Sequence, residues 1–129
     1  MITIYEEQRT GAKADTVKHS HASLEKCLEV IRKMDGFTCS QISIQHMDNM
    51  IMIGGGSQEF IVTVESNTAI HNLLCSTEEE EEEMVELTVG GQACEIPQQY
   101  IVSIELVESA LLQLLKDTST ELHWEIIKK

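Results

Sequence analysis

Two stretches of the chain repeat their apolar residues at spacings of three and four, which is the period of an amphipathic helix. The first stretch follows Ser20, a suitable N-cap, and ends before Gly36, a residue that favours the left-handed end of a helix. The second follows Ser103 and ends before Asp117. Five apolar residues of each helix share one face: Leu24, Cys27, Leu28, Ile31 and Met34 in the first, and Ile104, Val107, Leu111, Leu114 and Leu115 in the second.

Elsewhere apolar and polar residues alternate, or short β-branched runs occur, and both patterns are typical of strands. Residues 68–74 fit a strand or a single helical turn, and we favour the strand. We expect turns at three places: Asp48-Asn49, Gly54-Gly55-Gly56-Ser57 and Gly90-Gly91. Besides residues 68–74, the expected strands cover residues 2–5, 42–46, 50–53, 60–64, 84–89 and 122–126.

Two helices and about six strands in mostly adjacent order predict an α+β fold. We expect a single antiparallel sheet of about six strands with two helices packed on one face. A chain of 129 residues has the usual size of one domain, so residues 1–129 are expected to form a single unit.

The charge of the chain narrows the classes of partner. Nine Lys and Arg stand against 22 Asp and Glu, which leaves a net charge of −13. Such a polyanion is repelled by a phosphate backbone, so we expect no direct binding of nucleic acid. A cationic protein is the favoured partner, because the field would steer it during encounter.

A run of six glutamates is the most concentrated part of this charge. It consists of Glu78, Glu79, Glu80, Glu81, Glu82 and Glu83, and it predicts a flexible acidic loop over residues 76–83. We take these six residues as the candidate partner-binding site, with Glu79 to Glu82 acting mainly on the association rate. The alternative is a solvated loop with no specific role.

Catalytic and metal-binding patterns are weak. The Gly54–Gly56 run lacks the Lys and Ser or Thr of a phosphate-binding loop, and His19 and His21 are the only close pair of histidines. No spacing of Cys and His matches a zinc site, and there is no nucleophile-elbow pattern. We therefore expect a protein that is not an enzyme and has no metal or cofactor.

The first residues lack a secretory signal, and no apolar run approaches the ~20 residues that span a bilayer. We expect a cytoplasmic protein without membrane contact. Four cysteines lie scattered within or beside apolar stretches, which favours reduced and mostly buried thiols: Cys27, Cys39, Cys75 and Cys94.

The order of features from Val85 to Trp124 resembles the C-terminal half of immunity protein family one, the antidotes of bacterial polymorphic toxin systems. Met50 to Val64 is similar to that family's strand, glycine-rich turn and strand. In order, the matching features are a strand, Gly90-Gly91, Ile96-Pro97, a helix entry at Val102-Ser103 and the ending Leu122-His123-Trp124-Glu125.

The resemblance implies an immunity protein that binds a cognate secreted toxin domain and occludes its active site. The toxin would be a nucleic-acid-targeting deaminase or nuclease with a basic substrate channel. The shared residues are expected to build the scaffold, with Trp124 packed between sheet and helix. Two other hypotheses stay open: an acidic adaptor or nucleic-acid mimic that regulates a basic partner, and a small enzyme, which would need a pocket lined by converging polar groups.

Overall fold

The computed structural model describes residues 2–75, 83–116 and 121–129. Over these residues the chain forms nine strands, two α-helices and one short 3₁₀ helix. In chain order they are β1 (Ile2–Thr10), β2 (Lys13–His19), α1 (Leu24–Arg32), β3 (Gln41–His46), β4 (Asn49–Gly56), β5 (Glu59–Glu65), β6 (Ala69–Leu74), β7 (Met84–Val89), β8 (Gln92–Pro97), η1 (Gln98–Tyr100), α2 (Ile104–Lys116) and β9 (His123–Lys128).

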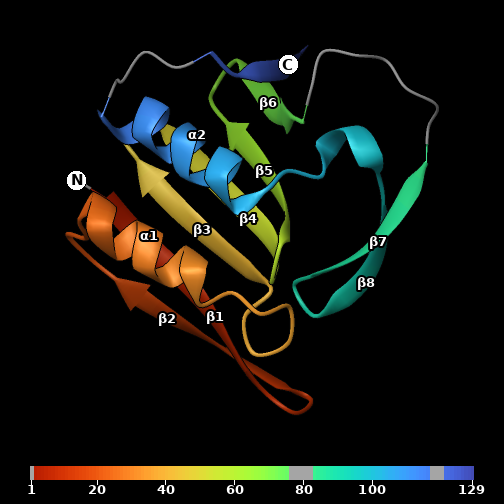
Figure 1. The fold of residues 1–129 in the computed structure, drawn as a ribbon. Coiled ribbons are helices and arrows are strands. Elements are labelled where there is room, and N and C mark those ends of the chain that lie inside the picture. The colour runs from red at the N-terminus through yellow and green to blue at the C-terminus, as the bar shows by residue number, and fades with distance from the viewer. Residues whose placement is uncertain (1, 76–82, 117–120) are drawn as a thin grey trace.

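Seven of the strands form one sheet in the order β2-β1-β3-β4-β5-β6-β9, and every neighbouring pair is antiparallel. The remaining two, β7 and β8, pair only with each other and form a separate hairpin (Figure 1). The predicted α+β class with a largely antiparallel sheet is confirmed. The single sheet of about six strands becomes a seven-stranded sheet with a two-stranded hairpin attached.

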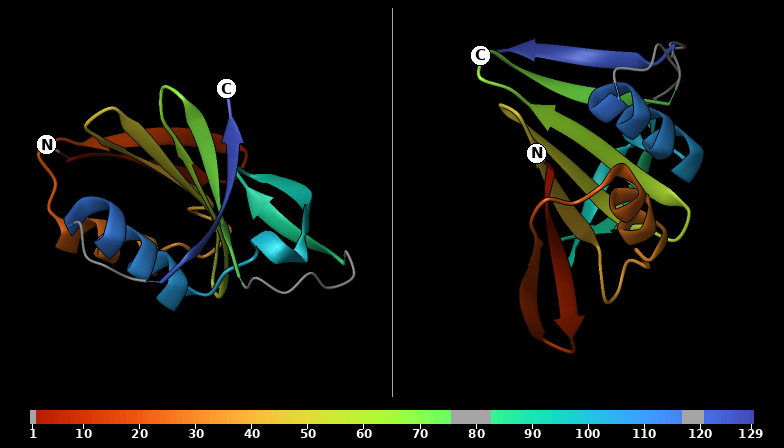
Figure 2. Two further views of the ribbon diagram at one scale, coloured as in Figure 1. Left: turned by 90° about the horizontal axis from the view of Figure 1, so that it is seen from above. Right: turned by 90° about the vertical axis from the view of Figure 1, so that its left-hand side faces the viewer.

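Both helices lie on the same face of the seven-stranded sheet, and the hairpin lies outside this helical layer (Figure 2). The alternating strand pattern explains the core, because every second residue of β3, β4 and β5 points to the helices. The fully buried side chains include Ile42, Ile44, Ile51, Ile53, Phe60 and Val62 from the sheet, Cys27 and Ile31 from α1, and Val107 and Leu111 from α2. All five apolar residues predicted for the inner face of each helix belong to this core or pack against it.

The two helices begin with serine N-caps. The prediction of Ser20 for α1 was wrong: Ser23 is the cap, and its Oγ accepts a hydrogen bond from Lys26 N at 3.1 Å. The three residues before Ser23 connect β2 to α1. A hydrogen bond from Ala22 N to Ile2 O fixes this connection to β1. The prediction of Ser103 for α2 is confirmed, since its Oγ accepts from Leu106 N at 3.3 Å.

The sequence pattern missed the length of the first strand and the strand that follows it. β1 continues beyond Tyr5 to Thr10, and β2 pairs with it from Lys13 to His19. β2 is exposed along most of its length, so it has no alternation of apolar and polar residues to reveal it. The favoured strand at residues 68–74 is confirmed as β6.

The turn predicted at Gly54-Gly55-Gly56-Ser57 was placed too early, because the three glycines are the last residues of β4 and pair with the start of β5. The turn lies at residues 57–58. The glycines are needed for close packing. A Cβ on Gly54 would lie 2.8 Å from Val89 of β7, and one on Gly56 would overlap the backbone of Gly36.

Trp124 of β9 lies between the sheet and α2, as predicted. Its ring packs against the core, and its Nε1 donates a hydrogen bond to Gln113 Oε1 of α2 at 3.2 Å. His71 of β6 meets the ring edge-on, with 6.4 Å between ring centroids. In the described part of the chain, neither helix has the length and apolar character needed to cross a membrane.

Candidate functional site

The structure describes one of the six glutamates that were predicted to bind a partner. Glu78, Glu79, Glu80, Glu81 and Glu82 lie outside the described residues. Glu83 is exposed and directly precedes β7, where its carbonyl oxygen accepts a hydrogen bond from Gln98 N at 2.8 Å. The glutamate run therefore leads directly into the β7–β8 hairpin, which makes the hairpin the candidate site.

The hairpin has an inner and an outer face. On the inner face Leu87 is buried, and its methyl groups cover Gly55 of β4. Val89 covers Gly54 in the same way. The β4 glycines thus let the hairpin pack directly on the sheet backbone, and this contact fixes which face of the hairpin remains in solvent.

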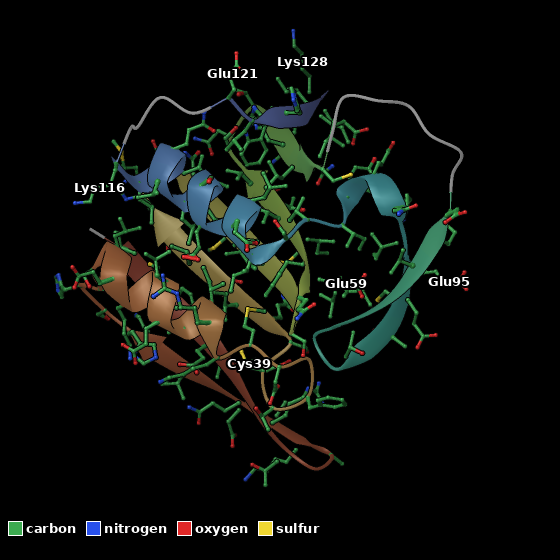
Figure 3. The ribbon with its side chains drawn as sticks, viewed as in Figure 1. Cys39, Glu59, Glu95, Lys116, Glu121 and Lys128 are labelled. Carbon is green, nitrogen blue, oxygen red and sulfur yellow. The ribbon has the colours of Figure 1, made fainter. Side chains whose placement is uncertain are left out.

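On the outer face, two exposed glutamates lie directly opposite each other. Glu86 of β7 and Glu95 of β8 are cross-strand partners, and we call this pair the acidic face. Figure 3 shows Glu95 directed away from the main sheet. Like charges in directly opposed positions destabilise a strand pair, so the acidic face is unfavourable unless a cation neutralises it.

No cation in the described part of the chain does so. No Lys or Arg occurs anywhere from Met34 to Leu115, although the same stretch holds 14 Asp and Glu. Throughout residues 2–75, 83–116 and 121–129, no ion pair includes Glu86 or Glu95. The acidic face therefore carries uncompensated negative charge on a packed scaffold.

Polar contacts hold the tip of the hairpin. Arg9 Nη2 of β1 donates a hydrogen bond to Gly90 O at 2.8 Å, and Gly91 N donates one to Ser40 Oγ at 2.9 Å. The Glu7 carboxylate joins these groups, because its Oε1 accepts from both Ser40 N and Ser40 Oγ at 2.8 Å. We call Glu7, Arg9 and Ser40 the latch.

Within the latch, Arg9 Nε lies 3.2 Å from Glu7 Oε2 but makes no hydrogen bond, so this contact is an ion pair. The predicted tight turn at Gly90-Gly91 is present, with φ values of +60° and +78°. These glycines also permit close approach, since a Cβ on Gly91 would overlap the Arg9 guanidinium. Sequence reasoning missed the latch because Glu7, Arg9 and Ser40 are far from the hairpin in the chain and form no local motif.

Among the described residues, no cysteine Sγ is hydrogen-bonded to a His, Asp or Glu side chain. All four are free. Cys27 and Cys39 are buried, and burial raises the pKa of each thiol to about 11. Cys75 is exposed and Cys94 partly so, which means that only half of the thiols are buried as expected.

Of the close histidine pair His19 and His21, His19 contacts an acidic side chain: its Nε2 lies 2.9 Å from Glu6 Oε1. Among the described residues, no three His, Cys, Asp or Glu side chains come close enough to hold a metal ion. The most distinctive chemistry of the described surface is thus the negative charge of the hairpin.

Comparisons of the chain with protein-family models, with curated proteins and with solved structures found no match. The resemblance to immunity protein family one rests on the order of residues in the chain. The geometry adds a separate observation, which is a firmly docked hairpin with an unneutralised acidic face.

Proposed function

We propose that this protein binds a basic protein through the β7–β8 hairpin and the glutamate run before it, and that the partner is a secreted bacterial toxin domain. In this role the protein is an antidote in the cytoplasm of the producing cell. The observation that carries the proposal is the opposed pair Glu86 and Glu95, which forms no ion pair with any other described residue. A Lys or Arg of a partner would neutralise both carboxylates at once.

The rigid attachment of the hairpin supports binding. The latch holds its tip and Leu87 holds its inner face, so the acidic face does not have to be ordered when a partner arrives. Preorganisation of this kind lowers the entropic cost of association. A standard interface of roughly 800 Å² per partner is larger than the hairpin's outer face, so neighbouring elements would take part.

We infer the class of partner from the negative charge of the acidic face. Toxins that act on nucleic acids have basic substrate channels, and an acidic surface can occupy such a channel in place of the phosphate backbone. The resemblance in residue order points to the same class, deaminases or nucleases. Because a producing cell must block nearly every toxin molecule, we expect a dissociation constant in the nanomolar range, which is about −12 kcal/mol.

Co-expression tests the proposal directly. The chain would be expressed with the C-terminal domain of a large secreted protein encoded immediately upstream, and survival and co-purification would be scored. Rescue together with a stable complex is the expected result. No rescue and no complex would overturn the antidote, and absence of such an upstream gene would favour an adaptor for a housekeeping basic protein.

A further inference from the structure

Phe37 differs from every other aromatic residue of the chain. The five Phe, Tyr and Trp residues all lie in the described part, and four of them pack or bond inside the molecule. Phe60 is buried in the core, Trp124 packs on α2, Tyr100 donates to Glu125, and Tyr5 lies under the Lys18 ammonium. Phe37 is 80% exposed.

The loop that carries Phe37 is built around one carboxylate. Asp35 Oδ1 accepts hydrogen bonds from the backbone N–H of Phe37 and of Thr38, both at 2.8 Å, and from Cys39 N at 3.2 Å. Its Oδ2 accepts from the Thr38 hydroxyl at 2.8 Å. Four hydrogen bonds to one side chain hold the backbone on both sides of the exposed ring in one conformation.

The same loop is also fixed to the sheet. Asp35 forms a β-bridge with Gly56 at the end of β4, and Ser57 N donates to Met34 O at 3.0 Å. The loop cannot swing to bury the Phe37 ring without breaking these contacts. An exposed Phe forgoes about 1.5–3 kcal/mol of burial free energy, and the fixed loop keeps the ring available to a partner.

Phe37 borders a groove that reaches the tip of the hairpin. The groove has a volume of about 390 Å³, and Phe37 and Gly36 line one side while Thr88 and Gly91 of the hairpin line another. Figure 1 shows the loop before β3 beside the tip of the hairpin. Because side chains alternate along a strand, Thr88 lies on the same face of β7 as Glu86. The ring, the groove and the acidic face therefore form one continuous surface.

We propose that Phe37 is the apolar anchor of the interface with the basic toxin domain, its ring entering an apolar pocket that lies beside the toxin's basic surface. This inference rests on the proposed function, because the partner is the same. The two parts of the surface act on different rates. Charge mainly speeds encounter, whereas a desolvated aromatic anchor mainly slows dissociation.

Surface plasmon resonance with the complete chain and the upstream-encoded toxin domain tests this division. Phe37→Ala is expected to raise the dissociation rate at least tenfold and to change the association rate less than twofold. Phe37→Leu, which keeps an apolar side chain, should recover part of the loss. Met47→Ala is the matched control, because Met47 is 77% exposed at the β3–β4 turn, the opposite end of those strands, and should change neither rate.

The outcomes separate the two proposals. If the wild-type chain binds the toxin domain and Phe37→Ala dissociates at the wild-type rate, the anchor is wrong and the proposed function stands. If the wild-type chain shows no binding at micromolar concentration, the proposed function fails and the anchor fails with it. Circular dichroism and the melting temperature of Phe37→Ala should match the wild type, since the lost side chain makes no core contact.

Discussion

The guanidinium of Arg9 donates a hydrogen bond to the carbonyl oxygen of Gly90 at 2.8 Å and so joins two residues that are 81 positions apart in the chain. Arg9 belongs to β1 of the main sheet and Gly90 to the turn of the hairpin. The bond fixes the hairpin at the end farthest from its connections to the rest of the chain. The location of the acidic face therefore depends on a residue of the first strand.

Gly91→Ala tests how tightly this contact is packed. Gly91 has φ +78°, and a Cβ there would displace the Arg9 guanidinium and break its bond to Gly90. Gly11 is a matched control, because it has φ +64° in the β1–β2 turn and a Cβ on it would meet no other atom within 4 Å. Gly11→Ala should cost about 1 kcal/mol of unfolding free energy through backbone strain alone. Gly91→Ala should cost about 2–3 kcal/mol, because a charge-assisted hydrogen bond is lost as well.

Urea unfolding of both variants measures this difference, and hydrogen exchange locates it. The Gly91→Ala variant should show faster exchange of the hairpin amides than the wild type, while the Gly11→Ala variant should not. Equal costs for the two substitutions would show that Arg9 moves aside freely and that the latch does not hold the hairpin.

The helices and the apolar strands could be predicted because their evidence is local. The apolar residues from Leu24 to Met34 recur at the helical period, and Ile42 and Ile44 alternate with polar residues. Each pattern places the apolar residues on one buried face, which identifies the first segment as a helix and the second as a strand. β2 has no buried apolar residue and could be found only from its pairing with β1. The Gly54–Gly56 run is typical of a turn when only the sequence is considered. Its role inside a strand becomes clear only from the β7–β8 hairpin, which packs on Gly54 and Gly55.

The site was predictable in its charge but not in its geometry. The glutamate run and the net charge are visible in the chain, whereas the opposition of Glu86 and Glu95 requires the strand register. Phe37 gave no signal, because an apolar residue after Gly36 fits a buried turn as well as an exposed one. Its exposure follows from the hydrogen bonds of Asp35, which depend on the folded loop.

Asp35 should make the stability depend on pH in the acid range. Burial raises the pKa of this carboxyl, but the hydrogen bonds from Phe37, Thr38 and Cys39 outweigh burial and lower the pKa to about 2. An unfolded Asp titrates near 3.9, roughly two units higher. The folded state thus favours the carboxylate, so its contribution is complete above about pH 4 and is lost as the pH falls to about 2.

Asp35→Asn removes this contribution, and Asp48→Asn is the control. Asp48 lies in the exposed β3–β4 turn and accepts no hydrogen bond from another described residue. We expect Asp35→Asn to lower the unfolding free energy by about 1–3 kcal/mol at pH 6, since the backbone donors lose a charged acceptor. The gap to wild type should narrow toward pH 2. A gap that stays constant from pH 6 to pH 2 would contradict the depressed pKa.

The thiols should divide into two classes. Cys27 and Cys39 are buried with pKa values raised to about 11, so at pH 8 they hold almost no thiolate and have no access to reagent. Cys75 is exposed and should react with Ellman's reagent in the native protein, followed more slowly by Cys94. Full reaction of four thiols should require denaturant. In the Cys75→Ser variant the fast phase should vanish, and a fast phase that persists would mean that another thiol is accessible.

The repulsion within the acidic face can be measured without any partner. Glu86→Gln removes one of two directly opposed charges, so it should stabilise the protein by about 0.2–1 kcal/mol in a buffer of about 10 mM ionic strength. At about 1 M salt the Debye length falls to ~3 Å, and this gain should disappear. Glu121→Gln changes the net charge equally, and Figure 3 places Glu121 near β9, away from Glu95. It should therefore show little gain at either salt concentration. Equal effects of the two substitutions at low salt would mean that only the net charge matters and that Glu86 and Glu95 do not form a distinct site for a cationic partner.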